Sequence, residues 1–531
     1  MRYEYKEFPY ETPPALRGAP EPRRPVAIVG AGPVGLALAI DLALRGVPSV
    51  VLDDNNVVSV GSRAICWSKR TLEIFDRLGV GERMVEKGVT WKVGRTYHGE
   101  REVWSFDLLP EEGHKMPAFI NLQQYYVEEY LVDRCRDFPE LIELRFKNRV
   151  VALEQGAESA ALTVETPDGT YRLEADWVVA CDGARSPVRA MLGLEFEGVL
   201  FEERFLIADI EMKADFPAER RFWFEPTFHS GQSALMHKQP DDIWRIDLQL
   251  GWDADPEQEN RPERIIPRIR KVVGDRPFEL DWSSIYTFQC RRLERFVHGR
   301  AIFAGDSAHI VSPFGARGGN GGVQDVDNLG WKLAAAIQGR AGPGLLPSYS
   351  DERVQAADEN ILNSSRSTNF MTPKTPVERL FRDQVLRLAS EAPFARRMVN
   401  SGRLSTPCVH DGSALNGPDD PALPAVSRPG APAPDAPAPW GWLLDRLGRG
   451  FALLALGEAA PPPAPEGVET LRIPQPSDEM RARWLGEAPG AICLIRPDQH
   501  VAARWTACDG AQLARALDRA MGRAPRQEDE A

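Results

Sequence analysis

Short apolar runs and longer apolar helices alternate in the first part of the chain. Residues 26–29 are a continuous apolar run of strand length, as expected of a strand buried on both faces. Residues 33–45 are apolar on nearly all sides and predict a buried helix that ends near Gly46, and residues 49–52 predict a second strand. This order of strand, helix and strand is typical of a parallel α/β sheet.

The pattern changes to strict alternation between about residues 200 and 290. Residues 243–250 predict an antiparallel strand with one face toward a cavity or solvent, because apolar side chains alternate there with Arg245, Asp247 and Gln249. A wholly apolar strand returns at 301–304, followed by a helix over 323–337 with apolar residues near helical spacing. Eight prolines between residues 418 and 439 predict a linker or wrapped loop. Residues 440–523 contain strand- and helix-like runs of their own, including apolar runs at 451–456 and 492–494 that predict buried strands.

Composition narrows the class of protein further. A chain of 531 residues with 43% hydrophobic and 27% charged residues predicts a globular protein of several domains. Its net charge of −13, without a basic cluster, argues against a nucleic-acid partner. No run approaches the roughly 18 apolar residues of a membrane span, and the polar, proline-rich first 25 residues are unlike a secretory leader, so we expect a cytoplasmic protein. The seven cysteines include no CxxC pair, which argues against a disulfide framework or a metal site.

A glycine-rich turn connects the first strand to the first helix. In Gly30-Ala31-Gly32-Pro33-Val34-Gly35, the first glycine permits a tight turn, the second lets a pyrophosphate approach the backbone, and the third allows close packing of helix on strand. Asp53 ends the next strand, 18 residues after Gly35, where a carboxylate can bind a ribose hydroxyl. The motif predicts dinucleotide binding, with a purely structural glycine turn as the alternative, and does not separate NAD from FAD.

Two further motifs follow predicted buried strands. Residues 181–189 contain Asp182-Gly183, which alone would be an ordinary turn. Residues 305–309 contain Gly305-Asp306, and the segment continues through Pro313 to Gly318-Gly319-Asn320. A carboxylate at such a strand end can bind a ribityl hydroxyl, and a glycine-rich turn leading into a helix presents backbone N–H groups to an electron-rich ring edge.

Together the three motifs resemble those of the class A FAD-dependent aromatic hydroxylases, the para-hydroxybenzoate hydroxylase and phenol hydroxylase type, over about residues 25–395. Within this family, the sequence pattern most resembles the branch of 3-(3-hydroxyphenyl)propionate hydroxylase and pentachlorophenol monooxygenase. The resemblance implies an α/β fold in which a Rossmann-like FAD-binding domain (25–195 and 296–395) is interrupted by an antiparallel substrate-binding sheet (196–295). An N-terminal arm (1–24) precedes it, and a linker (396–439) leads to a C-terminal thioredoxin-like domain (440–531) without redox cysteines.

The resemblance also implies which residues bind non-covalent FAD. Gln123 is an alternative to Gln124 in this set, and the chain departs from many relatives at Ala316-Arg317, where they carry Gly-Gln. The implied cofactor residues are Gly30, Gly32, Pro33, Val34, Gly35, Asp53, Arg63, Gln124, Val150, Asp182, Asp306, Gly318, Gly319 and Asn320.

The activity implied is hydroxylation of a phenolic or related aromatic substrate. NADPH or NADH reduces the flavin, and O2 then forms a hydroperoxide at C4a that the aromatic ring attacks. A base or cation near the substrate would favour the reactive phenolate, and His237, Arg245 and Asp247 on the alternating strands are candidates, with Pro313 near the flavin edge. A purely structural role is open for each of them. The alternatives are a flavin-dependent reductase or oxidase that inserts no oxygen, and a flavin-binding module without activity; a homodimer is also considered.

Overall fold

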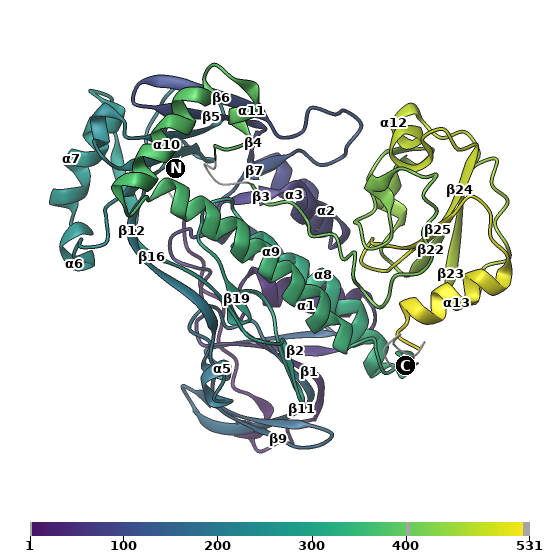
Figure 1. Ribbon diagram of the computed structural model, residues 1–531. Helices are drawn as coiled ribbons and strands as arrows, with labels where there is room; N and C mark the ends of the chain where they lie inside the picture. Colours follow the sequence, from purple (N-terminus) through teal and green to yellow (C-terminus); the bar gives the residue numbers. More distant parts are fainter. Residues whose placement is uncertain (1–2, 400–403, 524–531) are drawn as a thin grey trace.

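The computed structural model describes residues 3–399 and 404–523 (Figure 1). Its first sheet has the strand order β17-β18-β11-β1-β2-β8, with β9 and β10 joined beyond β11. β1 lies between β11 and β2 and is parallel to both, which confirms the predicted unit of strand, helix and strand. The bounds are β1 Arg24–Val29, α1 Pro33–Leu44, β2 Ser49–Asp53, β8 Ile142–Phe146, β9 Arg149–Gln155, β10 Ala160–Thr166, β11 Gly169–Ala180, β17 Val297–His298 and β18 Ala301–Phe303.

The second sheet also has eight strands, in the order β19-β16-β12-β15-β14-β13-β5-β6. The pairs around β15 are antiparallel, as predicted, whereas β13 pairs with β5 in parallel. β5 and β6 join this sheet although they precede residue 196. The bounds are β5 Val93–His98, β6 Arg101–Asp107, β12 Glu197–Glu211, β13 Arg220–Phe224, β14 Ser233–Lys238, β15 Ile243–Gln249, β16 Glu279–Arg292 and β19 His309–Ile310.

The two faces of this second sheet differ in chemistry, as the alternation predicted. On one face, Trp244, Ile246 and Leu248 pack against Ile265 and Ile269 of α7 (Pro262–Val273). The strand register places Arg245, Asp247 and His237 together on the opposite face, because residues directly opposite in a sheet point to the same side. This opposite face, called the inner face below, meets the first domain: Arg245 donates hydrogen bonds to the backbone carbonyls of residues 62 and 63.

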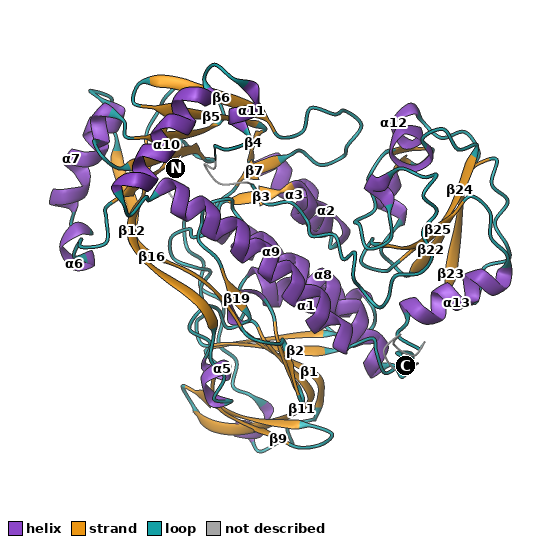
Figure 2. Ribbon diagram, viewed as in Figure 1, coloured by secondary structure: helices purple, strands orange, loops and turns teal. Residues whose placement is uncertain are grey.

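Helices cover the first sheet and connect it to the C-terminal part of the chain (Figure 2). α8 (Gly318–Ile337) and α9 (Pro347–Met371) are long, and α1 packs against α8 and α4. α8 begins five residues earlier than the sequence pattern predicts, because the glycine-rich segment forms its first turns. Other helices of the first two domains are α2 Lys69–Arg77, α3 Gly81–Lys87, α4 Gln124–Cys135, α5 Pro187–Met191, α6 Pro256–Glu259, α10 Pro376–Ala389 and α11 Pro393–Arg396. A small sheet has the order β3-β7-β4: β3 Cys66–Ser68, β4 Val89–Trp91, β7 Phe119–Asn121.

The C-terminal domain contains a four-stranded sheet of order β23-β22-β24-β25. The two predicted buried strands are confirmed as β22 (Phe451–Gly457) and β24 (Gly490–Ile495), with β23 Val468–Ile473, β25 Val501–Trp505, α12 Asp478–Met480 and α13 Gly510–Ala520 beside them. The proline-rich segment wraps this sheet, since Gly430 and Ala433 donate backbone hydrogen bonds to Val501 and Gln499. The thioredoxin-like assignment stays a prediction, and residues 400–403 of the expected linker and 524–531 of this domain lie outside the described residues.

Buried charges join the C-terminal domain to α8 and α9. Arg496 is fully buried and binds both Glu352 of α9 (2.7 and 2.9 Å) and Asp498 (3.0 and 2.5 Å). Lys332 and Trp331 of α8 complete this ion-pair cluster: the lysine donates to Glu352 (2.7 Å) and the indole N–H to Asp498 (3.0 Å). Such a cluster fixes the two parts of the chain together, because a buried charge is costly unless it is paired. In the described part of the chain, no helix is both long and apolar enough to cross a membrane.

Candidate active site

The glycine-rich turn lies at the start of α1 and leaves room for a ligand at one glycine only. A Cβ on Gly30, whose φ is +108°, would lie 2.5 Å from the carbonyl oxygen of Cys181. A Cβ on Gly35 would lie 2.0 Å from the carbonyl oxygen of Gly30. A Cβ on Gly32 would have no protein atom within 4 Å, and Gly32 lines a cavity. The first and third glycines therefore serve packing, and the second leaves the backbone open to a ligand.

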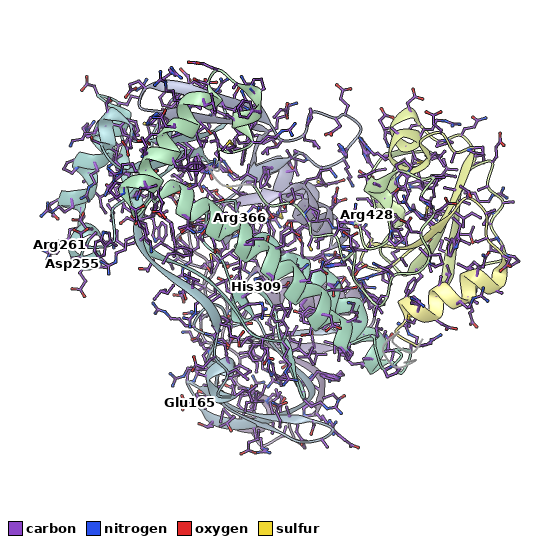
Figure 3. All side chains as sticks on the ribbon, viewed as in Figure 1. Glu165, Asp255, Arg261, His309, Arg366 and Arg428 are labelled. Atoms are coloured by element: carbon purple, nitrogen blue, oxygen red, sulfur yellow. The ribbon has the colours of Figure 1, made fainter. Side chains whose placement is uncertain are left out.

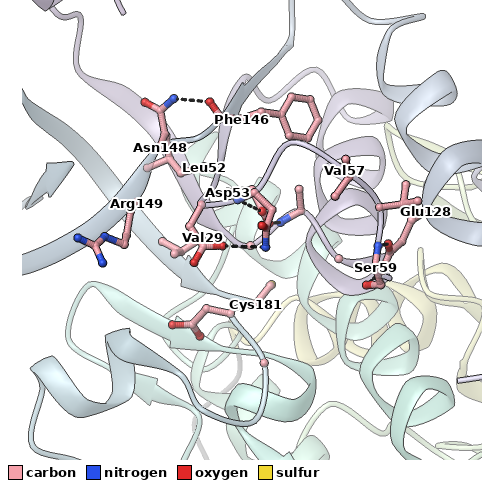
Figure 4. Close-up of a pocket in the computed structure, with 18 of the residues that line it drawn as sticks. Val29, Leu52, Asp53, Val57, Ser59, Glu128, Phe146, Asn148, Arg149 and Cys181 are labelled. Carbon is pink, nitrogen blue, oxygen red and sulfur yellow. Dashed lines mark hydrogen bonds between the residues drawn. The ribbon is translucent and has the colours of Figure 1, made fainter. Parts of the chain in front are cut away.

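The cavity has a volume of about 510 Å³ and is bounded by the ends of β1, β2 and β11 (Figure 4). A segment of residues 54–63, called the cofactor loop below, forms much of one wall. Of the residues expected to bind the cofactor, those that line this cavity are Gly30, Gly32, Asp53, Arg63, Val150 and Asp182. The carboxylate of Asp182 accepts a hydrogen bond from the Val188 N–H (3.0 Å), while its Oδ1 is buried without a partner. The cradle fits an adenosine diphosphate group, because it combines an accessible backbone turn with acceptors for hydroxyls.

Asp53 stands at the carboxyl end of β2, where the sequence placed a ribose-binding carboxylate. Its side chain accepts hydrogen bonds from the backbone N–H groups of Ala31 (2.6 Å) and Asn55 (2.9 Å). Burial raises the pKa of this carboxyl, and the two N–H donors oppose that shift. The carboxylate thus connects the glycine turn to the cofactor loop, and Asp53 lines the cavity.

Gln124 and Arg245 hold the cofactor loop from two sides. The Gln124 side chain accepts from the Ala64 N–H (3.1 Å) and donates to Ser59 (3.2 Å) and Glu128 (2.8 Å). Arg245 forms an ion pair with Asp209 (2.7 Å) and donates to the backbone carbonyls of residues 62 and 63. Gln124 and Arg245 therefore position the loop that carries Arg63. Gln123, the competing alignment, donates instead to the carbonyl of Pro240 (3.2 Å) in the second domain.

Asp306 lies in the 3-10 turn Gly305–Ser307, directly after β18. Asp306 is exposed, and no described residue donates a hydrogen bond to its carboxylate. One carboxylate oxygen would lie 3.9 Å from a Cβ added to Gly318, so the side chain lies beside the first turn of α8. Desolvation by the surrounding protein raises the pKa of this carboxyl, while the nearby side chains of His309 and Arg63 lower it. Asp306 is therefore an acceptor without a protein donor, as a carboxylate that binds a ribityl hydroxyl must be.

His309, labelled in Figure 3, is buried and forms hydrogen bonds within the protein. Its Nε2 bonds to Asp325 (2.7 Å), which also accepts from Arg353 (2.6 Å) and from the Gly305 N–H (2.9 Å). This network fixes the turn that presents Asp306.

The other expected cofactor residues at α1 and α8 occupy packing positions. Val34 packs where α1 meets α8: its Cγ2 would lie 2.8 Å from a Cβ on Gly322, so the two helices approach closely because residue 322 is a glycine. The Asn320 amide is engaged: it accepts from the Ser68 N–H (2.9 Å) and donates to the carbonyl of Cys66 (2.9 Å). In the first turn of α8, backbone N–H groups rather than side chains are therefore available to the ring of a flavin. Pro33, Gly318 and Gly319 lie in the first turns of α1 and α8, and Pro313 is exposed in the loop before α8.

The inner face of the second sheet carries two titratable side chains with unpartnered buried atoms. Oδ1 of Asp247 and Nδ1 of His237 have no hydrogen-bond partner. Burial lowers the pKa of His237 well below its ordinary value, and Arg220 and Arg245 add to that shift, so the imidazole is neutral. Burial raises the pKa of Asp247 to about 7, with Arg245 opposing the shift. Aromatic rings share this face. Phe205 pairs with Gln249, two residues from Asp247, and stacks on Phe288 with ring centroids 4.7 Å apart, and the Trp91 ring lies 5.8 Å from that of His237.

The sequence reasoning did not identify several residues of the site. Phe8, Ser59, Glu128 and Asn148 line the cavity. Glu128 accepts from both the N–H (2.6 Å) and the hydroxyl (2.7 Å) of Ser59. Their one signal in the sequence was the position of Glu128 four residues after Gln124, on the same face of a helix.

We expect the Asp306→Ala variant to bind FAD about 10- to 100-fold more weakly, because it loses a charge-assisted hydrogen bond to a hydroxyl. Titration of FAD into the apo variant, followed by flavin fluorescence, measures the loss. Asp306→Asn keeps an acceptor and is expected to recover part of the affinity. Wild-type affinity in Asp306→Ala would show that this carboxylate does not contact the cofactor.

The amino-acid sequence is similar to those of known flavin-dependent proteins. A family model described as "FAD binding domain" matches residues 23–364. A "Flavin-dependent monooxygenase" of Mycobacteroides abscessus is 32% identical over 499 residues, covering 90% of this chain and 96% of the relative. A "3-(3-hydroxy-phenyl)propionate/3-hydroxycinnamic acid hydroxylase" of Mycolicibacterium smegmatis is 29% identical, covering 82% of this chain and 79% of the relative.

Solved structures agree with the fold over most of the chain. The anhydrotetracycline hydroxylase OxyS from Streptomyces rimosus superposes with a TM-score of 0.72 at 27% identity, covering 94% of this chain and 99% of that one. The p-nitrophenol 4-monooxygenase PnpA from Pseudomonas putida DLL-E4 has a TM-score of 0.64 at 26% identity, covering 72% of this chain and 100% of that one. The similarity to OxyS extends through the C-terminal domain.

Proposed function

Because this chain belongs to the FAD-binding family of flavin-dependent monooxygenases, we propose that it hydroxylates a phenolic or related aromatic substrate, using FAD, O2 and NADPH or NADH. One observation carries the choice of substrate class. The inner face combines stacked aromatic rings with a single unpartnered buried carboxylate oxygen, that of Asp247. Such a surface suits a flat ring that bears a hydroxyl.

When bound, FAD supplies the redox chemistry and the activation of O2. The chain holds it through the open backbone at Gly32 and the carboxylates of Asp53 and Asp306. Arg245 acts as a positioning residue, since its guanidinium is engaged by Asp209 and by the cofactor loop. The aromatic residues of the inner face exclude water from the reacting groups.

We assign to Asp247 the role of accepting the phenolic proton, and to His237 that of a neutral hydrogen-bonding partner. A phenol becomes a stronger nucleophile as its O–H proton is transferred, and a base with a pKa near the working pH transfers protons most effectively. With its pKa raised to about 7, Asp247 meets that requirement at neutral pH. The electropositive side chains of Arg220 and Arg245, which lower the Asp247 pKa, also favour the phenolate.

The proposal is tested by incubating the purified enzyme with phenolic acids, halophenols and larger polyphenols. The expected result is substrate-stimulated NADPH or NADH oxidation, with a product heavier by one oxygen atom. Stimulated oxidation that yields only H2O2 or a reduced product with every substrate would instead favour a reductase or oxidase. The homodimer considered above is untested, and the cytoplasmic location stays a prediction.

The Asp247 assignment predicts a pH dependence. For a phenol whose own pKa lies near 10, we expect kcat/KM to rise as the pH passes through about 7, because Asp247 is protonated below that value and accepts a proton above it. Asp247→Asn should remove this rise and lower the rate at pH 8 by about 100-fold or more. The same substitution at Asp275, an exposed aspartate of the same domain, should leave the profile unchanged. A rise that persists in Asp247→Asn would exclude this residue as the base.

A further inference from the structure

The N-terminal arm is joined to the cofactor loop by backbone contacts. Glu7 forms a β-bridge with Val57. The Phe8 N–H donates to the carbonyl of Asn56 (2.7 Å), and the Asn56 side chain donates back to the carbonyl of Phe8 (3.2 Å). Asn56 follows Asp53 by three residues, so the arm is fastened to the loop directly beyond the ribose-binding carboxylate.

The Phe8 ring forms part of the cavity wall. It stacks on Phe146, with ring centroids 4.7 Å apart and planes at 21°, and both rings line the cavity (Figure 4 labels Phe146). In a dinucleotide site of this kind the pyrophosphate lies at the helix N-terminus and the ribose at the carboxylate that ends the second strand. The adenine therefore extends past Asp53, away from the glycine turn. Phe8, Phe146 and Val150 line the cavity together with Asp53.

Two tyrosines fasten the rest of the arm. The Tyr5 hydroxyl accepts a hydrogen bond from the Gly61 N–H (3.0 Å) at the far end of the cofactor loop. Tyr3 stacks on Tyr125 of α4 (centroids 4.2 Å apart) and donates its hydroxyl proton to Glu129 (2.8 Å). The arm thus contacts both ends of the loop and the helix behind it.

We propose that residues 3–8 of the arm are part of the cofactor site, with Phe8 providing an aromatic contact for the adenine and Tyr5 holding the cofactor loop closed over the adenosine half. This inference rests on the binding of FAD and is independent of the substrate that is oxidised. The ligand class is an adenine nucleotide joined to a flavin.

Measurement of FAD affinity in apo variants tests the assignment. Phe8→Leu keeps an apolar side chain but removes the aromatic face, so the apo protein should fold with a slightly lower unfolding midpoint, through loss of the stacking on Phe146, while FAD binds about tenfold more weakly. Tyr5→Phe should weaken FAD binding about threefold through the loss of one hydrogen bond. The matched control is Tyr10→Phe, which removes an exposed hydrogen bond of the same arm to Asp168 (3.0 Å) and should leave FAD affinity unchanged.

Hydrogen exchange gives a second readout that does not depend on turnover. Addition of FAD should slow exchange of the Phe8 and Gly61 amides, which form the contacts between arm and loop. The proposal is overturned if Phe8→Leu binds FAD as tightly as the wild type, or if FAD leaves these two amides unprotected. Tight FAD binding without any hydroxylated product would refute the proposed function and leave this inference standing.

Discussion

We expect Gly35→Ala to impair folding, and Gly32→Ala to fold normally but lose FAD binding. An alanine Cβ at residue 35 would lie 2.0 Å from the backbone oxygen of Gly30, and backbone atoms in a buried turn cannot move aside cheaply. Overpacking of this kind costs about 1–3 kcal/mol and occasionally more, and we expect the upper end here. A total stability of about 5–15 kcal/mol makes such a loss large, so Gly35→Ala should give little folded protein.

Gly32→Ala should fold normally and lose the cofactor. Its backbone is extended (φ −78°), and its Cβ would meet no protein atom within 4 Å. The apo protein should be as stable as the wild type, or more stable by up to about 1 kcal/mol. The new methyl group would occupy the place where the pyrophosphate approaches the backbone, and we expect FAD affinity to fall more than about 100-fold.

Thermal unfolding of the apo proteins and FAD titration separate the two outcomes. If Gly32→Ala were as unstable as Gly35→Ala, protein atoms would have to fill the space beside Gly32, and the cavity would not be open there. If it bound FAD normally, the pyrophosphate would have to lie elsewhere.

Arg496→Ala is expected to destabilise the whole chain by about 3–5 kcal/mol, the cost of removing one partner from a buried ion pair. Arg496 is fully buried and neutralises both Glu352 and Asp498. Its positive charge holds the pKa of Glu352 well below the ordinary value, with Lys332 adding to that effect. Without Arg496, Glu352 would keep its ion pair with Lys332, whereas Asp498 would keep the indole N–H of Trp331 and the contact with His500 but lose its arginine.

Equilibrium unfolding in denaturant measures this loss. The matched control is Arg428→Ala, which removes an arginine from an ion pair of similar geometry with Asp411 on the surface (2.6 and 3.0 Å). Exposed pairs contribute about 0–1 kcal/mol, so Arg428→Ala should change stability little. Equal losses in the two variants would mean that burial does not set the strength of these pairs.

Local patterns in the sequence predicted the features that depend on neighbouring residues. The glycine turn, Asp53 at the end of β2 and Asp306 after β18 each occupy the expected place, because one strand and one turn fix them. The apolar and polar faces of β15 were equally predictable from alternation.

Features that depend on long-range packing were not predictable from such patterns. The start of α8 was missed because glycines are poor helix formers, whereas here Gly322 allows Val34 and Gly305 to approach closely. The different roles proposed for Arg245, Asp247 and His237 depend on which of these side chains has a buried ion-pair partner. That partner, Asp209, lies 36 residues from Arg245, and no spacing rule connects the two.

The hydrogen bonds from Arg245 to the cofactor loop connect the strand proposed to bind the substrate with the cavity proposed to bind FAD. Arg245 belongs to the strand that carries Asp247, yet its guanidinium bonds to the carbonyls of residues 62 and 63, next to the cofactor cavity. If FAD and the substrate both bind this arrangement of strand and loop better than any other, each raises the affinity for the other by the same factor. The enzyme that already holds one of the two ligands would then bind the other more tightly, through this contact between strand and loop.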